Sequence, residues 1–209
     1  MNITEQFTQK LLVEGNDDQH VVWALCKGNA VAENFDVLDC NGIEKLIEQL
    51  PTRLKQSGLQ TLGIIIDADT NLSRRWVSLR DLINSIGYTI PNEIPNEGLI
   101  HSEPGKIKIG IWIMPDNKLN GMLEDFIKFL IPEDDKLLPE AESTLENVES
   151  KGLNKYTLVH RAKALIHSWL AWQEDPGTPM GLAITKRYLT TENEITNSFV
   201  VWMESLFKE

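Results

Sequence analysis

The chain has 209 residues, of which 42% are hydrophobic and 24% are charged; this balance is typical of a folded globular protein and excludes a largely disordered one. Its formal net charge of −11 argues against a broad electrostatic nucleic-acid binder, because contacts with the phosphate backbone generally rely on lysine and arginine. A nuclease that meets phosphates through metal ions and a local basic patch is still compatible with this charge.

The first part of the chain is predicted to alternate strands and helices. Strands are predicted over residues 10–13, 35–39 and 61–66, and helices over 17–27, 43–56 and 71–86. The first and third strands are near-continuous runs of apolar residues, which is typical of strands buried on both faces of a parallel sheet. This order predicts a βαβαβ core.

The region after this core contains two further predicted strands. Residues 87–105 are predicted to form a loop with a short strand at 98–101. Residues 106–114 are predicted to form a strand in which Lys106, Lys108 and Gly110 alternate with isoleucines, and this alternation favours an edge or antiparallel position.

The last part of the chain is predicted to be helical. Helices are expected at 122–131, from the acidic segment 133–135 to about residue 148, and at 155–174, which is predicted to be the longest. Two short helices are expected to end the chain. We therefore predict an α/β fold with a mostly parallel, Rossmann-like sheet flanked by helices, in which residues 1–131 form the core and residues 132–209 a helical annex.

Acidic residues follow three of the predicted strands. Glu14 ends the first strand, Asp67 and Asp69 end the third, and Glu124 comes shortly after the strand at 106–114. Ligands of open α/β sheets sit beyond the carboxyl ends of the strands, so we expect these carboxylates to converge, with Asp18 in the next helix as a further candidate. Crowded carboxylates repel unless a cation lies between them, and oxygen ligands favour Mg²⁺ or Mn²⁺ over zinc.

Each of these residues also has a purely structural explanation. Acids at the start of a helix stabilise the helix dipole, which would explain Asp18 and Glu124. An aspartate after a strand can cap the next helix, which would explain Asp69. The helix dipole would also explain Glu14. Glu14 and the pair Asp67 and Asp69 are the stronger functional candidates, because an unpaired carboxylate beside apolar residues is costly.

Basic residues matter because phosphoryl transfer needs positive charge at the phosphate. Arg74 or Arg75, on the helix after Asp69, is a candidate, and Arg74 is taken here as the phosphate-binding residue. Lys163, on the predicted long helix, is the second candidate. The alternative for both positions is a solvated helix face, which is common for charged side chains.

At the acidic positions the sequence resembles the Toprim family, the metal-binding domain of topoisomerases, primases and OLD-type nucleases. The first motif of that family is a strand-terminal glutamate in an E-G-x-x-D pattern, matched by Glu14, Gly15 and Asp18. The second is an Asp-x-Asp pair, matched by Asp67 and Asp69. The chain is most similar to a group of small Toprim-like proteins of unknown function, DUF3226, through residues 115–117, 121–125, 163–173 and 176–181.

The resemblance implies a Toprim-like fold and a Mg²⁺- or Mn²⁺-dependent phosphodiester hydrolase that acts on DNA or RNA. The residues that it implies as catalytic are Glu14, Asp67 and Asp69, and Asp18 and Glu124 would complete the set of metal ligands. Glu14 is also the general acid or base that is suggested for the family.

Two features of the sequence leave an alternative open. Topoisomerases and primases usually continue the Asp-x-Asp pair with two residues and a glycine, whereas this chain has Thr70-Asn71-Leu72, so the OLD-like branch fits better. The sequence contains no G-x-x-x-x-G-K-[ST] loop, so any ATPase that is needed is a separate chain. The alternative is therefore a non-catalytic Toprim-like module that binds metal or docks on such a partner in defence or repair. A homo-oligomer is also left open.

The sequence gives no sign of export or membrane insertion. The N-terminus has no cationic start followed by an apolar segment, and no apolar stretch approaches the roughly 20 residues that span a bilayer. Cys26 and Cys40 are therefore expected to be reduced thiols in the core. We expect a cytoplasmic protein without a membrane partner.

Overall fold

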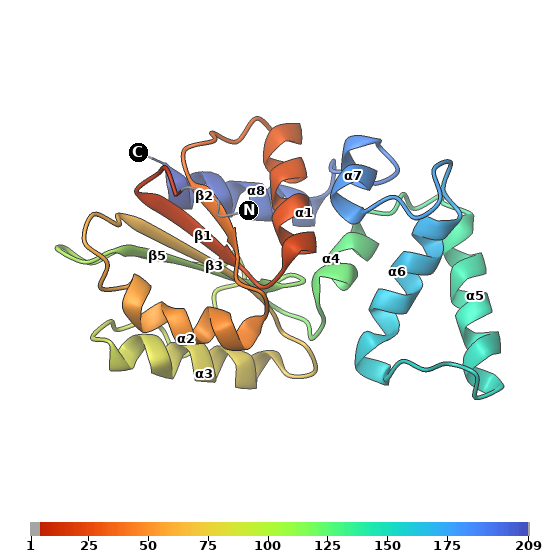
Figure 1. Cartoon of the computed structure of the whole chain (residues 1–209), viewed down its shortest axis with the longest axis horizontal. Helices are drawn as coiled ribbons and strands as arrows, with labels where there is room; N and C mark the ends of the chain where they lie inside the picture. The colour runs from red at the N-terminus through yellow and green to blue at the C-terminus, as the bar shows by residue number, and fades with distance from the viewer. Residues whose placement is uncertain (1–4, 209) are drawn as a thin grey trace.

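Five strands form one sheet in the computed structural model of the chain, which describes residues 5–208 (Figure 1). The strands lie in the order β2-β1-β3-β5-β4, and all neighbours are parallel except β4 and β5. The prediction of an α/β fold with a mostly parallel sheet flanked by helices is confirmed. The strands are β1 Gln9–Val13, β2 Asp36–Asp39, β3 Thr61–Asp67, β4 Leu99–His101 and β5 Lys108–Met114.

The helices before residue 131 follow the predicted order closely. The second and the fourth are each shorter than predicted, and the second ends two residues after Pro51, which lies inside it. These helices are α1 Asn16–Gly28, α2 Ile43–Arg53, α3 Leu72–Ser85 and α4 Leu123–Phe129. The later helices are α5 Leu137–Ser150, α6 Arg161–Ala171, α7 Met180–Thr185 and α8 Glu194–Phe207.

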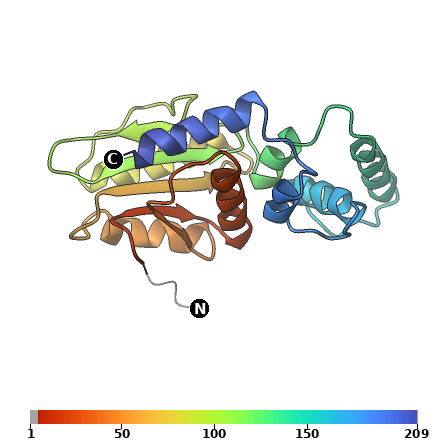
Figure 2. The same cartoon turned by 90° about the horizontal axis from the view of Figure 1, so that it is seen from above.

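The sheet is covered by helices on both faces. Helices α2 and α3 lie on one face, and α1 and α8 lie on the other (Figures 1 and 2). Because successive side chains of a strand point to opposite faces, Leu12 packs in the core beside α2 and α3, whereas Leu11 and Val13 pack in the core beside α1 and α8. Burial on both faces explains the apolar character of the strands.

The expected edge-side or antiparallel position of the strand at 106–114 is confirmed only in its antiparallel pairing with β4. β5 lies inside the sheet, parallel to β3, and the short β4 is the antiparallel strand at the edge. Lys106 precedes β5, and Gly110 is small because the buried side chain of Leu206 in α8 lies directly against it. In this alternating series only Gly110 is therefore explained by the close approach of α8, since Lys106 is exposed to solvent.

The predicted long helix at 155–174 is also wrong in extent. Helix α6 covers only Arg161–Ala171 and is preceded by a 3-10 turn at Leu158–His160. The longest helices are α3, α5 and α8, with 14 residues each, so the prediction of two short C-terminal helices fails for α8. None of the helices described over residues 5–208 is both long and apolar enough to cross a bilayer.

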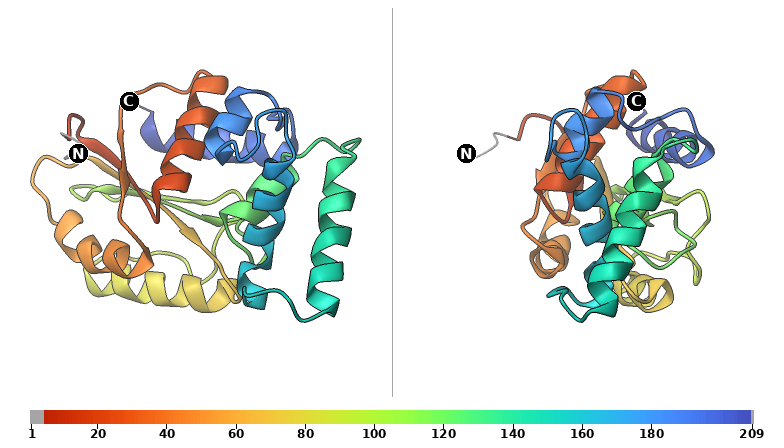
Figure 3. Two further views of the ribbon diagram at one scale, coloured as in Figure 1. Left: turned by 45° about the vertical axis from the view of Figure 1, so that its right-hand side comes forward. Right: turned by 90° about the vertical axis from the view of Figure 1, so that its right-hand side faces the viewer.

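The segment after residue 131 contributes to two different parts of the molecule. Helices α5 and α6 form a hairpin that stands beside the sheet and contacts it through α4 (Figure 3). Helix α8 returns to the sheet and packs on β3, β4 and β5. Residues before and after 131 therefore both contribute to the core on the face covered by α1 and α8. The domain boundary after residue 131 stays a prediction.

The contact between α8 and the sheet gives a first testable prediction. A methyl group added at Gly110 would overlap with the Leu206 side chain, which is fully buried. We expect Gly110→Ala to lower the free energy of unfolding by about 1–3 kcal/mol, as is usual for overpacking. Gly28→Ala is the matched control in urea unfolding, because a Cβ there meets nothing within 4 Å. Equal stability of the two variants would contradict the close approach.

Candidate active site

The carboxyl ends of β1 and β3 form a crevice near the middle of the sheet. The chain passes from β1 through α1 to β2 on one side of β1, and then crosses to β3 on the other side. Such a reversal of strand order is where ligands bind in open α/β sheets. Glu14, directly after β1, and Asp67, the last residue of β3, therefore lie at this crevice.

Hydrogen bonds link the two strand ends to α4. The Asp67 backbone N–H donates to Glu14 Oε1 at 2.8 Å, and the Leu123 backbone N–H donates to Asp67 Oδ1 at 3.0 Å. Leu123 is the first residue of α4, and the side chain of the following residue, Glu124, is buried. Residues that are more than 50 positions apart in the sequence thus meet in one site.

Asp18 is buried in the first turn of α1 beside the same crevice. Its Oδ2 accepts a hydrogen bond of 3.1 Å from the Gly15 backbone N–H, so it caps the start of α1. Burial raises the pKa of Asp18 to about 7 together with the negative charges of Glu14 and Glu124. Asp18 therefore both caps α1 and lies close to the other carboxylates.

The pKa values of the strand-end residues are raised as well. Burial raises the pKa of Asp67 well above its usual value, and the charges of Asp18, Glu14, Glu124 and Asp69 act in the same direction. Burial also raises the pKa of Glu14, although the hydrogen bond from Asp67 opposes this rise. All five predicted acidic residues are thus close enough to repel one another.

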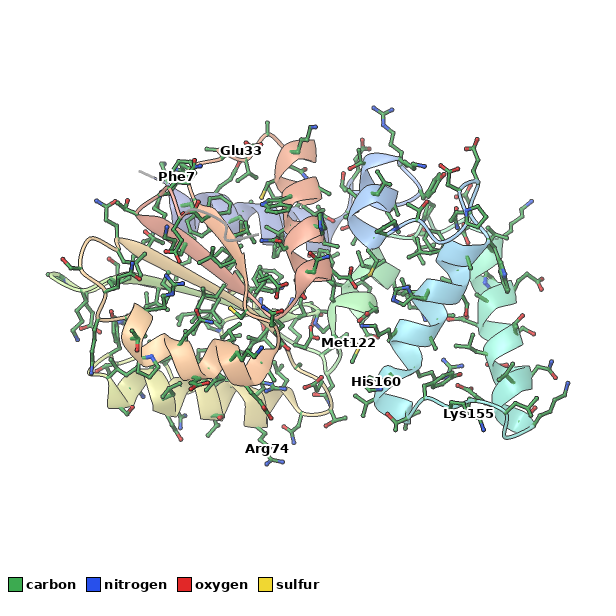
Figure 4. All side chains as sticks on the ribbon, viewed as in Figure 1. Phe7, Glu33, Arg74, Met122, Lys155 and His160 are labelled. Atoms are coloured by element: carbon green, nitrogen blue, oxygen red, sulfur yellow. The ribbon has the colours of Figure 1, made fainter. Side chains whose placement is uncertain are left out.

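Asp69 extends this acidic cluster toward α3. Its backbone has a φ of +51° in the left-handed region, and its N–H donates to the Gly121 carbonyl oxygen at 2.8 Å. Its side chain forms an ion pair with Arg75. Arg74 is exposed and points away from the body of the molecule (Figure 4).

The helix pattern contains a signal that distinguishes the two arginines. The buried side chains of α3 include Trp76 and Leu79. Arg75 lies four residues before Leu79 and therefore shares the inward side of the helix, whereas Arg74 does not. Periodicity along α3 would have favoured Arg75 as the residue near the site.

Lys163, the second predicted basic residue, lies at the site. Its Nζ is 3.6 Å from Glu124 Oε1, and its side chain is about half exposed. It comes from α6, so the hairpin contributes directly to the acidic cluster of the sheet. The phosphate-binding role of Lys163 stays a prediction.

A groove of about 460 Å³ opens beside the carboxylates. One wall is formed by the loops after β3 and β5 and by α4, and it includes Asp69 and Glu124. The other wall is the 3-10 turn at Leu158–His160 with the start of α6, where the sequence indicated only Lys163 as a site residue. Figure 4 shows Met122 on the side of the core and His160 at the start of α6, with the groove region between them. The site is therefore accessible from solvent.

One protein family matches almost the whole chain. The family described as "Protein of unknown function (DUF3226)" matches residues 8–208. The chain belongs to the DUF3226 family. No curated protein and no solved structure shows significant similarity to it. The match covers both parts of the DUF3226 protein, the α/β core with its carboxylates and the helices that follow.

The donor set of the DUF3226 protein suits a hard divalent cation. It consists of carboxylate oxygens on a buried floor, and mutual repulsion among them is relieved by a positive ion. Within residues 5–208, however, no three Asp, Glu, His or Cys side chains already form a metal-binding group as they stand. Their oxygens are instead engaged by backbone N–H groups, by Arg75 and by Lys163. These side chains would therefore have to rotate before they could bind a metal ion.

Proposed function

We propose that this DUF3226 protein is a Toprim-like phosphodiester hydrolase that uses Mg²⁺ or Mn²⁺ to cleave DNA or RNA. The observation that supports this proposal is the convergence of the two resemblance motifs at the switch point of the sheet. Glu14 from the first motif and Asp67 from the second are joined there by a hydrogen bond, although no local contact in the sequence requires it. The relation to Toprim and OLD-type nucleases is part of the proposal.

The roles of the residues follow from their positions. Glu14, Asp67 and Glu124 supply the inner oxygen ligands, with Asp18 behind them and Asp69 at the entrance of the groove. Bound cations would activate the attacking water and stabilise the leaving oxygen. Lys163 is exposed enough to leave Glu124 and bind a phosphate oxygen once a cation neutralises that carboxylate.

A second candidate function is a non-catalytic module that works with a separate ATPase. It is favoured by the net charge of −11 and by the pairing of Lys163 and Arg75 with carboxylates, which leaves little free positive charge at the site. A homo-oligomer is compatible with either function.

The decisive experiment measures cleavage and metal binding on the same preparation. Purified protein is incubated with supercoiled plasmid or with RNA, with and without Mn²⁺, and Mn²⁺ binding is measured by calorimetry. The hydrolase predicts Mn²⁺-stimulated nicking or RNA cleavage. Metal binding without cleavage of any substrate favours the metal-binding module, and no binding at millimolar metal favours a docking role.

The ion pair between Arg75 and Asp69 gives a further prediction. Arg75 occupies the side of the cluster that a cation must approach, and its charge also lowers the pKa of Glu14. We expect Arg75→Gln to tighten Mn²⁺ binding about three- to tenfold in calorimetry, the size of a charge interaction near the surface. Arg74→Gln removes the same charge one residue away and should leave the affinity unchanged. Weaker Mn²⁺ binding by Arg75→Gln would show that Arg75 supports the metal site instead.

A further inference from the structure

We propose that the groove beside the carboxylates binds an unpaired strand of nucleic acid rather than a duplex. The inference rests on the proposed function, because it names the substrate class of the same site. It is carried by the chemistry of the two groove walls, by the pairing of the basic residues and by the size of the groove.

The two walls of the groove differ in chemistry. The core wall presents the carboxylates of Asp69 and Glu124, and the α6 wall presents the apolar side chains of Leu158 and Val159. Leu158 is 85% exposed, the highest value among the large hydrophobic side chains that the structure describes as exposed. An apolar surface opposite a phosphate-handling site suits the face of a base, which is hidden within the stack of a duplex and free in a single strand.

The basic residues on or beside the groove leave little free charge for a phosphate backbone. Each one is already paired with a carboxylate. These pairs are Lys128–Glu142 at 2.7 Å, Arg161–Glu149 at 2.9 Å and Lys163–Glu124 at 3.6 Å. Duplex binders gain most of their affinity by neutralising many phosphates, and only a few basic residues flank this groove. Its affinity for a nucleic acid must therefore come mainly from contacts with bases.

The size of the groove agrees with this ligand. A volume of about 460 Å³ lies in the range of small-molecule pockets. Such a space accommodates about one or two nucleotides of a flexible strand whose chain continues on both sides. A duplex would have to unpair before a base reached Leu158.

The test compares single strands with duplexes on the full chain. Anisotropy is measured in Ca²⁺ with labelled oligothymidylate and oligouridylate of about 20 nucleotides, and with the duplexes made from each. We expect the single strands to bind at least about tenfold more tightly than the duplexes. With no more than about three phosphates contacted, the slope of log affinity against log salt should be no steeper than about −2.

Two leucine variants test the apolar wall. Leu158→Ser should weaken binding of the single strand about five- to tenfold, through loss of apolar contact. Leu153→Ser is the matched control, because Leu153 is 62% exposed but does not line the groove; it should bind as the wild type does. Mn²⁺ calorimetry on Leu158→Ser should match the wild type, which would show that the carboxylate site is intact.

The outcomes separate this inference from the proposed function. Equal affinity for the duplex, or unchanged strand binding by Leu158→Ser, overturns the inference, and Mn²⁺-dependent cleavage would then still support the hydrolase. A wild-type dimer that Leu158→Ser converts to a monomer in sedimentation also overturns it, because a second copy would cover Leu158. Failure to bind or cleave any nucleic acid overturns the proposed function and this inference together.

Discussion

Asp67→Asn is expected to raise the melting temperature of the metal-free protein and to remove most of the stabilisation by Mn²⁺. Burial raises the pKa of Asp67, and the negative charges of four neighbours raise it too. These neighbours are Asp18, Glu14, Glu124 and Asp69. An amide has no charge to repel, so the metal-free site relaxes. The amide oxygen can still accept the hydrogen bond from the Leu123 N–H, so the start of α4 stays capped.

The metal-dependent part of this prediction has a definite size. At a hundredfold excess over its dissociation constant, a cation that binds only the folded state adds about 2.7 kcal/mol. For a chain of this length that corresponds to a rise of roughly 5–10 °C in the wild type. Asp67→Asn should show a few degrees at most, and its Mn²⁺-dependent cleavage should fall by at least about a hundredfold.

Asp67→Ala separates the structural role of the side chain from its charge. Alanine relieves the same repulsion but leaves the Leu123 N–H without its acceptor, so this variant should be less stable than Asp67→Asn. Thermal unfolding with EDTA and with Mn²⁺ measures both effects. If Asp67→Asn destabilises the metal-free protein and keeps the full metal-induced shift, Asp67 is a structural cap and the proposed site is wrong.

The individual parts of the site were easier to predict than their arrangement. Apolar runs that stop at Glu14 and Asp67 indicate buried strands whose ends carry acids, because few other patterns place a carboxylate after such a run. The register that joins the two residues is not encoded locally, since their hydrogen bond spans 53 positions. The switch point can therefore be recognised only from the strand order in the structure.

Three misjudged or missed features share one physical cause, which is packing between distant segments. Gly110 looked like part of an alternating edge strand because nothing nearby in the sequence shows that Leu206 packs on it. The start of α6 looked like the middle of a longer helix, although Leu158 instead forms a wall of the groove. The choice between Arg74 and Arg75 depended on which side of α3 faces Asp69.

The stability of the metal-free protein is expected to fall as pH rises from about 4 to about 7. Burial raises the pKa of Asp18 from its usual 3.8 to about 7, so in this window the folded state holds a proton that the unfolded state has lost. Asp67 and Glu14 act in the same direction, because burial raises both pKa values. The raised pKa of Asp18 alone accounts for at most about 4 kcal/mol of this loss of stability, because a change of one pKa unit corresponds to about 1.4 kcal/mol.

Carboxylates elsewhere in the molecule have the opposite effect at lower pH. Hydrogen bonds from Lys106 and His101 lower the pKa of Glu103 to about 2, so its contribution is present above its usual pKa of 4.5 and is lost as pH falls toward 2. The two trends together place the maximum stability of the metal-free protein near pH 4–5, below the range that is usual for proteins.

Urea unfolding in EDTA across pH 4–8 measures this trend, and Asp18→Asn tests its origin. The amide keeps an acceptor for the Gly15 N–H but cannot ionise, so the variant should lose less stability between pH 4 and 7 than the wild type. Mn²⁺ should reverse the slope, because it binds the ionised cluster and displaces protons from it. Calorimetry in buffers of different ionisation enthalpy should therefore show proton release near pH 6. A metal-free protein that becomes steadily more stable from pH 5 to 7 would mean that these carboxylates do not share a buried site, and the basis for a cation there would be lost.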